Sequence, residues 1–461
     1  MARLNLSRDT KHRTHGGAQA FGHLKPIQQL RRSVLSCLLW ENEFYEDGKS
    51  IAERITEVAA LVNPEELASL AVEARKEMNL RHTPLLLLDV LSKTGPELMA
   101  DTTASVISRA DEMGELLSIY WRNGRKTVPR QMRKGLAKAF TKFDEYQLAK
   151  YDRDGAVKLR DVLRIVRPKP DNDEQSALWK RVKDRTLETP DTWEVALSDG
   201  ADKRTTFERL IREGNLGYLA LLRNLRNMAQ AEVDASLVKG AIVARRNGAQ
   251  RVLPFRYIAA ARAAPMFEPA LDQAFLASLE EMPHLDGKTV IVVDVSGSMY
   301  QKMSRKSDLT RADAGCALAA IARGLFYDVR IFATAGNDST RIHQTKEVPA
   351  RHGMALVDAI HGMCRPLGGG GIFLKQVMDH LRKEVGEVDR LIVVTDEQDC
   401  GIGHGDSPLA AVPIAPKAYM VNVASAKNGI GYGENWTHLD GFSENVFRFI
   451  YEVERDGQGP N

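Results

Sequence analysis

Residues 286–298 read Asp-Gly-Lys-Thr-Val-Ile-Val-Val-Asp-Val-Ser-Gly-Ser, and this stretch decides the fold of the C-terminal part of the chain. The run Thr289–Val293 is continuous and rich in β-branched residues, which is typical of a strand buried on both faces of a parallel sheet. Similar runs alternate with helical segments, the runs at 329–333, 391–395 and 418–423 and the helices at 310–326 and 373–385. This alternation predicts a doubly wound α/β domain over residues 286–461.

The preceding residues, 1–285, have a different pattern. From residue 26 to residue 281, apolar residues recur at helical spacing in short segments that Pro and Gly separate. Asn63-Pro64-Glu65-Glu66 supplies a helix cap, a proline at the first helical position and acids in the first turn. Further helices are expected at 84–92, 96–109, 129–143, 159–166, 216–230 and 233–246. Many short helices in series predict an all-α HEAT-like repeat, so the fold class is α+β multidomain.

A motif with chemical potential follows the first predicted strand directly. Asp294-Val295-Ser296-Gly297-Ser298 has the spacing DxSxS, which at a strand's carboxyl end turns one carboxylate and two hydroxyls toward one point. Oxygen ligands of this kind suit Mg²⁺. Asp396 ends another apolar strand and could complete the site. The alternative is that Asp294 and the serines only cap the following helix.

Together these residues resemble the metal-ion-dependent adhesion site of von Willebrand factor A domains, over about residues 288–454. The resemblance implies Mg²⁺ or another divalent cation, held by Asp294, Ser296, Ser298 and Asp396. That family also supplies a threonine from a Gly-Gly-Thr loop, whereas residues 368–372 here read Gly-Gly-Gly-Gly-Ile, with no hydroxyl at Gly371. Thr345 and Thr395 are the possible substitutes.

Basic residues are concentrated in one segment. Between Trp121 and Pro170 there are 15 Lys and Arg against five Asp and Glu, whereas the whole chain carries a net charge of +3. A local cationic surface attracts a polyanion, so we expect phosphate contacts; the alternative, a solvated helix face, usually carries balancing acids. Aromatic residues that could stack on bases, or simply belong to the core, are Tyr120, Trp121, Tyr146 and Tyr151. The residues expected to contact RNA are Arg125, Lys126, Arg130, Arg133, Lys134, Lys138, Lys142, Lys150, Arg153, Lys158, Arg160, Arg164, Arg167 and Lys169.

A second candidate surface lies at residues 217–228, which read Gly-Tyr-Leu-Ala-Leu-Leu-Arg-Asn-Leu-Arg-Asn-Met. Helical spacing predicts one apolar face and directs the polar residues elsewhere; the expected face is Leu219, Leu222, Leu225 and Met228, and the polar residues are Arg223, Asn224 and Asn227. We expect Arg223 and Arg226 to contact RNA. A core helix with solvated polar residues remains an equal alternative for each arginine.

The segment 217–228 resembles the TROVE module of Ro proteins. Further similar stretches follow in the family's order over residues 16–283, namely Gly16-Gly17, 30–32, 43–45, 159–164 and 252–257. The resemblance, to a bacterial or phage version, implies a monomeric HEAT-like ring closed by the A-type domain. It further implies that the hole takes single-stranded 3′ ends of misfolded RNA. The region 124–169 would then be the surface for structured Y RNA.

The composition narrows the function classes. With 43% hydrophobic and 27% charged residues, the chain is neither wholly disordered nor a membrane protein, and a cytoplasmic location is expected. Four cysteines without CxxC spacing indicate neither a disulfide framework nor a zinc cluster. No P-loop, HExxH or nucleophile elbow is present, so we expect no enzyme activity.

Three function classes follow. The first is an RNA chaperone, quality-control factor or scaffold that binds small non-coding RNA and hands it to an exoribonuclease. The alternative is a protein-interaction scaffold, in which the α/β domain binds an acidic partner residue through Mg²⁺ and the helical part has no direct RNA role. The basic segment favours RNA, because a scaffold does not need it. A nuclease is less favoured, since two-metal chemistry needs more than one incomplete metal site.

Overall fold

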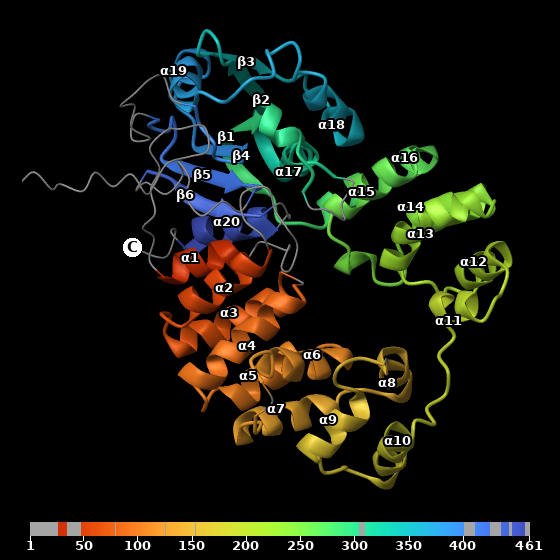
Figure 1. The fold of residues 1–461 in the computed structure, drawn as a ribbon. Coiled ribbons are helices and arrows are strands. Elements are labelled where there is room, and N and C mark those ends of the chain that lie inside the picture. Colours follow the sequence, from red (N-terminus) through yellow and green to blue (C-terminus); the bar gives the residue numbers. More distant parts are fainter. Residues whose placement is uncertain are drawn as a thin grey trace, which may run out of the picture. The chain divides into compact units, whose positions relative to one another are not determined.

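The computed structural model describes residues 26–34, 48–78, 80–124, 126–152, 154–303, 309–400, 411–424, 435–441 and 445–456 (Figure 1). By their contacts, the residues form two compact units. Of the described residues, the helical unit contains 26–34 and those between 49 and 210, and the sheet unit contains residue 48 and those between 211 and 456.

The helical unit is a series of short helices, as the spacing of apolar residues predicts. Several of these helices pack on near neighbours along the chain: α3 on α4 and α5, α4 on α6, and α5 on α7. The predicted cap is present, because the Asn63 side chain accepts a hydrogen bond from the backbone of Glu65 at 2.8 Å. The helices are α1 (Pro26–Val34), α2 (Gly48–Ala59), α3 (Pro64–Lys76), α4 (His82–Thr94), α5 (Met99–Val106), α6 (Asp111–Tyr120), α7 (Arg130–Phe140), α8 (Glu145–Tyr151), α9 (Leu159–Val166), α10 (Asp173–Asp184), α11 (Trp193–Ser198) and α12 (Lys203–Arg212).

A glycine lets α5 and α7 approach closely. A Cβ atom at Gly135 would lie 2.6 Å from the Ala100 carbonyl oxygen and 2.7 Å from Thr103 Cβ. Both distances are shorter than van der Waals contact, so only glycine fits at this crossing. The buried side chains of α7, including Leu136 and Phe140, complete the contact. This packing fixes which face of α7 is left to solvent.

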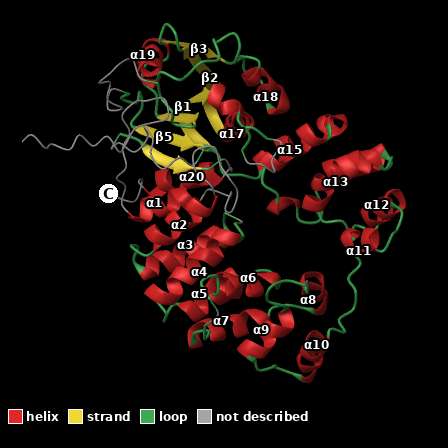
Figure 2. Cartoon of the chain, viewed as in Figure 1, coloured by secondary structure: helices red, strands yellow, loops and turns green. Residues whose placement is uncertain are grey.

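The sheet unit contains a six-stranded sheet in the order β3-β2-β1-β4-β5-β6 (Figure 2). All neighbours are parallel except β2 and β3. The strands are β1 (Leu285–Asp294), β2 (Phe326–Asn337), β3 (Ile342–Glu347), β4 (Arg390–Thr395), β5 (Lys417–Asn422) and β6 (Thr437–Asp440). The strand order reverses between β1 and β4, where open α/β sheets bind ligands. Asp294 ends β1 and Asp396 follows β4, so both predicted carboxylates lie at this switch point.

Helices cover both faces of the sheet, which confirms the doubly wound prediction. Helix α19 (Leu374–Glu384) shares a hydrophobic core with Val290 and Val292 of β1 and Leu391 of β4. On the opposite face, Gly315 of α17 (Arg311–Leu325) approaches Val293. Helix α20 (Asn445–Asp456) contacts the same face through Glu454.

The compact sheet unit begins well before its first strand. It includes α13 (Tyr218–Gln230), α14 (Ala235–Ala244), α15 (Phe255–Ala263) and α16 (Glu268–Glu280). Asp272 of α16 accepts a hydrogen bond at 2.8 Å from the backbone of Met354, in α18 (Gly353–His361). Arg262 of α15 pairs with Asp313 of α17 at 3.5 Å. The change from helices to sheet at residue 285 is therefore not a boundary in packing.

The helices were compared with what a membrane-spanning helix requires. Within the described part of the chain, none of the helices has the length and apolar character that crossing a bilayer requires.

Candidate nucleic-acid interface

Helix α7 presents a cationic face to solvent. Met132, Leu136 and Phe140 are buried against the helical unit, which turns the basic residues outward. The α7 face consists of Arg130, Arg133, Lys134 and Lys138, all exposed. The helix contains no acidic residue, and within the described chain Arg130, Arg133 and Lys134 form no ion pair. Three exposed cations thus lie within five residues without an ion pair among the described residues, and Lys134 acts on Asp101 only through longer-range electrostatics.

Two other predicted contacts are engaged within the helical unit. Lys138 pairs with Asp101 at 2.6 Å, at a site open to solvent. Lys142 donates hydrogen bonds to the carbonyl oxygens of Ala104 and Ile107, at the carboxyl end of α5. A cation there complements the free carbonyls of the helix end. Burial, with the nearby charge of Lys76, lowers the pKa of Lys142 below its ordinary value. Lys142 therefore has a structural role at the end of α5.

The remaining predicted residues of this segment vary in their surroundings. Lys126, Arg164, Arg167 and Lys169 are exposed. Lys158 pairs with Asp154 at 2.6 Å, Arg160 is half-buried, and Lys150 lies 5.5 Å from the Tyr146 ring centroid. Arg125 and Arg153 lie outside the described residues. Among the four aromatic candidates, Tyr146 is half exposed at 50%, whereas Tyr120 is buried, with Trp121 and Tyr151 between these extremes.

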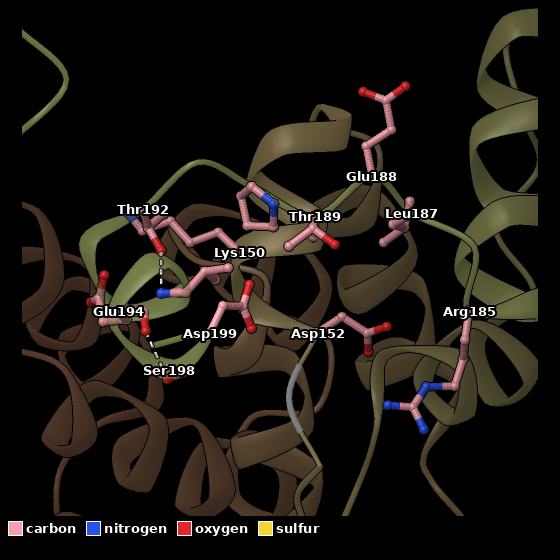
Figure 3. Close-up of a pocket in the computed structure, with 13 residues that line it drawn as sticks. Lys150, Asp152, Arg185, Leu187, Glu188, Thr189, Thr192, Glu194, Ser198 and Asp199 are labelled. Carbon is pink, nitrogen blue, oxygen red and sulfur yellow. Dashed lines mark hydrogen bonds between the residues drawn. The ribbon is translucent and has the colours of Figure 1, made fainter. Parts of the chain in front are cut away.

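A pocket next to this segment has mixed charge. Its volume is about 490 Å³, and Figure 3 shows Lys150 and Arg185 among the residues that line it. Four acidic residues also line it, namely Asp152, Glu188, Glu194 and Asp199. Carboxylates outnumber cations there and repel phosphate, so this pocket is less suited to bind phosphate than the exposed α7 face.

Helix α13 carries Arg223 and Arg226 on an exposed side. The predicted apolar face needs two corrections: Leu219 is 40% exposed, while Asn224 is buried. Tyr218 and Leu221 pack inward in place of Leu219, and the Asn224 side chain donates a hydrogen bond to the Ala220 carbonyl. A cavity of about 740 Å³ lies between α13 and α14, and sequence reasoning missed two of its polar residues, Arg246 and Asn247.

The four predicted metal ligands lie at the switch point of the sheet. Asp294, Ser296 and Asp396 are buried, and the Ser296 and Ser298 hydroxyl oxygens are 3.3 Å apart. The Asp294 carboxylate accepts hydrogen bonds from the Ser296 backbone at 2.8 Å and from the Thr395 hydroxyl at 2.7 Å. Burial and the neighbouring Asp396 raise the pKa of Asp294 well above its ordinary value. We call Asp294, Ser296, Ser298, Arg311, Thr395, Asp396, Glu397 and His438 the switch-point cluster.

The glycine-rich loop passes beside the DxSxS loop. A Cβ atom at Gly297 would lie 3.1 Å from the Gly369 carbonyl oxygen. At Gly371 a Cβ atom would lie 2.1 Å from Cys400 Sγ, and the Gly371 N–H donates to Asp338 at 2.7 Å. Ile372, the next residue, is buried in the core of the α19 face. Neither position offers the hydroxyl that the adhesion-type family uses.

The donor set does not fit the cation site implied by that resemblance. Thr345 hydrogen-bonds to Thr334 and His343, and Thr395 donates to Asp294. In addition, a fixed cation faces one carboxylate, because Arg311 Nη1 lies 3.6 Å from Asp396 Oδ2. The assignment of Asp294, Ser296, Ser298 and Asp396 as metal ligands stays a prediction.

Comparison with known proteins identifies the family. The family model of the TROVE domain matches residues 27–186 and 171–312, which together span more than half of the chain. A comparison with curated protein sequences returns no match. Among solved structures, the crystal structure of the Deinococcus radiodurans RO (RSR) protein is similar in fold, with a TM-score of 0.57 and 18% identity over 91% of this chain and 96% of that chain. The chain thus belongs to the TROVE domain family, the family of the Ro proteins.

Proposed function

We propose that this protein binds small non-coding RNA on two separate surfaces and acts as an RNA chaperone, quality-control factor or scaffold for an exoribonuclease. The observation that carries the proposal is the α7 face, where Arg130, Arg133 and Lys134 are exposed without ion-pair partners among the described residues. The proposal assigns no reaction to the chain, and it places the protein in the cytoplasm as a monomer. The RNA partner is supported by the family, whose members are known for binding RNA.

The α7 face suits a structured RNA. Its cations recur at intervals of three and four residues, so they lie along one line of the helix. Lysine and arginine that neutralise phosphates release counterions, which gives affinity without reading sequence. A folded RNA such as Y RNA has a backbone of closely spaced phosphates that these cations can neutralise. Lys126, Arg164, Arg167 and Lys169 are exposed in the same unit and extend the basic surface.

Helix α13 suits a single strand. Arg223 and Arg226 are exposed, and they belong to the sheet unit, whereas the α7 face belongs to the helical unit. The cavity between α13 and α14 adds Arg246, whose guanidinium can bind backbone phosphates, whereas the Asn247 amide already donates to the Gly214 and Leu216 carbonyl oxygens. The two surfaces therefore use different residues on different units.

The decisive experiment replaces Arg130, Arg133 and Lys134 by glutamine. Each lost phosphate contact lowers the slope of log affinity against log salt by about 0.7 to 0.9. The triple variant is therefore expected to lose about two slope units, and to bind structured RNA about 10- to 100-fold more weakly at physiological salt. A filter-binding titration at several salt concentrations measures both.

The matched control removes two positive charges from a balanced helix of the same unit. Lys180 and Lys183 are exposed on α10, which also contains Asp173, Glu174 and Asp184. Replacing both lysines by glutamine should leave the affinity within about twofold, because their charges are compensated. If the control and the α7 variant lose equal RNA affinity, the loss reflects the net charge of the protein and not contacts made by the α7 face. Unchanged affinity in the α7 variant would contradict the proposal and favour the protein-interaction scaffold.

A further inference from the structure

Arg311 is a fully buried arginine at the centre of the sheet unit. It is the first residue of α17 and has no solvent exposure. Its backbone N–H donates to the Gln301 carbonyl at 3.0 Å, which fixes the start of the helix beside the DxSxS loop. Its guanidinium lies 3.6 Å from Asp396, which is also fully buried. Removing a guanidinium from water is costly, so such a residue persists only where an opposite charge compensates it.

Each carboxylate of the switch-point cluster has a partner within the protein. Asp396 faces Arg311, and the Glu397 carboxylate lies 2.6 Å from the His438 imidazole. Asp294 accepts hydrogen bonds from the Thr395 hydroxyl and from the Ser296 backbone. Each of these carboxylates is therefore already engaged by a group of the protein itself, and Arg311 supplies a positive charge at Asp396.

We propose that the Arg311 guanidinium takes the place of the divalent cation at this switch point, so that the cluster holds its loops together without metal. The guanidinium is the fixed charge that joins the start of α17 to the loop after β4. A divalent cation beside it would be repelled, because charges in a buried site are weakly screened. The missing hydroxyl at Gly371 and the buried arginine then have one explanation. The guanidinium of Arg311 supplies the positive charge that a bound metal ion would otherwise supply.

The proposal also bears on partner binding. A metal ion at this position can coordinate the carboxylate of a partner protein only if one of its coordination positions is open. A buried guanidinium that faces Asp396 offers none, because Arg311 has no exposed surface. The sheet unit is then expected to have no cation-dependent affinity for acidic peptides.

The test measures metal dependence directly. The purified full-length protein is treated with EDTA, and its melting temperature is then measured with and without millimolar Mg²⁺ or Mn²⁺. The wild type should show no shift, because a ligand stabilises a fold only where it binds the native state. Titration of Mn²⁺ followed by electron paramagnetic resonance should show no site of micromolar affinity.

The Arg311→Ala variant removes the cation that faces the buried Asp396 and should melt several degrees lower. It should also acquire stabilisation by millimolar Mn²⁺ or by methylguanidinium, because either cation can enter the vacated space. Arg311→Lys keeps a positive charge, so it should remain independent of metal. The matched control is Arg323→Ala, at the other end of α17, where the guanidinium bonds only the Val329 carbonyl among the described residues. It should acquire no cation dependence.

The opposite result overturns the proposal. If Mg²⁺ or Mn²⁺ raises the melting temperature of the wild type, and Asp294→Ala or Ser298→Ala abolishes that rise, a divalent cation occupies the site beside Arg311. Should Arg311→Ala fail to fold, the wild-type melting and Mn²⁺ titrations still decide the question. If neither Mn²⁺ nor methylguanidinium restores the stability of Arg311→Ala, the proposal is also contradicted. The guanidinium would then act through packing and not through its charge.

Discussion

Helix α7 and the switch-point cluster contain the same kinds of charged side chain in opposite surroundings. On α7, Arg130 and Arg133 are exposed and without ion-pair partners in the described chain. In the cluster, Arg311 and Asp396 are both fully buried and face each other. A charged residue therefore indicates a ligand site only where the fold leaves its charge uncompensated. Where the fold supplies the partner, the same residue type stabilises the structure.

This difference has an energetic consequence. An exposed ion pair contributes at most about 1 kcal/mol, because water and salt screen it. Breaking a buried pair by removing one partner costs about 3 to 5 kcal/mol, since the other charge remains in a poor solvent. Substitutions of similar chemistry should thus separate into stability effects at buried pairs and RNA-binding effects at exposed cations. Three predictions test that separation.

The largest effect on stability is expected at a second buried arginine, Arg390. Its guanidinium donates to both carboxylate oxygens of Glu454, at 2.6 and 2.5 Å, and to the Thr289 hydroxyl at 2.7 Å. Burial alone would raise the pKa of Glu454, but hydrogen bonds from Arg390 and Lys417 hold it below its ordinary value. Replacing Glu454 by glutamine should cost about 3 to 5 kcal/mol. Urea unfolding followed by circular dichroism measures this cost.

The control for Glu454 is a pair of the same geometry at the surface. Arg330 bonds both carboxylate oxygens of Glu347, and the two side chains are 38% and 44% exposed. Glu347→Gln should cost less than about 1 kcal/mol. Equal costs at Glu454 and Glu347 would remove burial as the reason for the difference.

The second prediction concerns the two proposed RNA surfaces. Replacing Arg223 and Arg226 by glutamine should weaken binding of an RNA with a free single-stranded 3′ tail by about tenfold, through two lost phosphate contacts. Binding of a tail-less structured RNA should be unchanged. The α7 variant should show the reverse preference. Gel-shift titrations of both variants with both RNAs measure this, once circular dichroism shows native helicity. Parallel losses would mean one continuous surface, and unfolding would mean that α13 needs these arginines for its structure.

The smallest effect is expected within the α7 face itself. Lys138 pairs with the exposed Asp101, whereas Arg133 has no such partner in the described chain. Lys138→Gln should shift the melting temperature by no more than about one degree, because exposed pairs contribute little. It should also weaken RNA binding less than Arg133→Gln. A larger loss from Lys138→Gln would show that the pair with Asp101 opens when RNA binds.

The sequence predicts the elements that rest on long periodic runs. The buried runs that become β1, β2, β4 and β5, and the helix at 159–166, are confirmed. The strands β3 and β6 were not predicted, because β3 is a largely exposed antiparallel edge strand and β6 has only four residues. Leu219 was placed on the wrong side of α13, since Tyr218 fills the inward position.

The candidate sites were predictable in position and less so in chemistry. Helical spacing identified the cations of α7, and the ends of two apolar strands identified Asp294 and Asp396. Their partners come from distant parts of the chain, and a single sequence does not reveal those. Lys142 bonds carbonyl groups more than thirty positions away, and Arg311 lies 85 positions before Asp396 in the numbering. An arginine at a helix start ordinarily indicates a solvated residue, so its burial depends on tertiary packing.

The position of Gly371 limits how the chain can evolve. A Cβ atom there would lie 2.1 Å from Cys400 Sγ and 3.2 Å from Asp338 Oδ1. A single mutation to threonine therefore meets a steric obstacle before it offers a ligand, and the Cys400 thiol must turn away or be replaced first. Arg311 would still repel an incoming cation. If the guanidinium substitutes for a cation as proposed, a hydroxyl at position 371 alone would not create a metal site, and a second change at Arg311 would be needed.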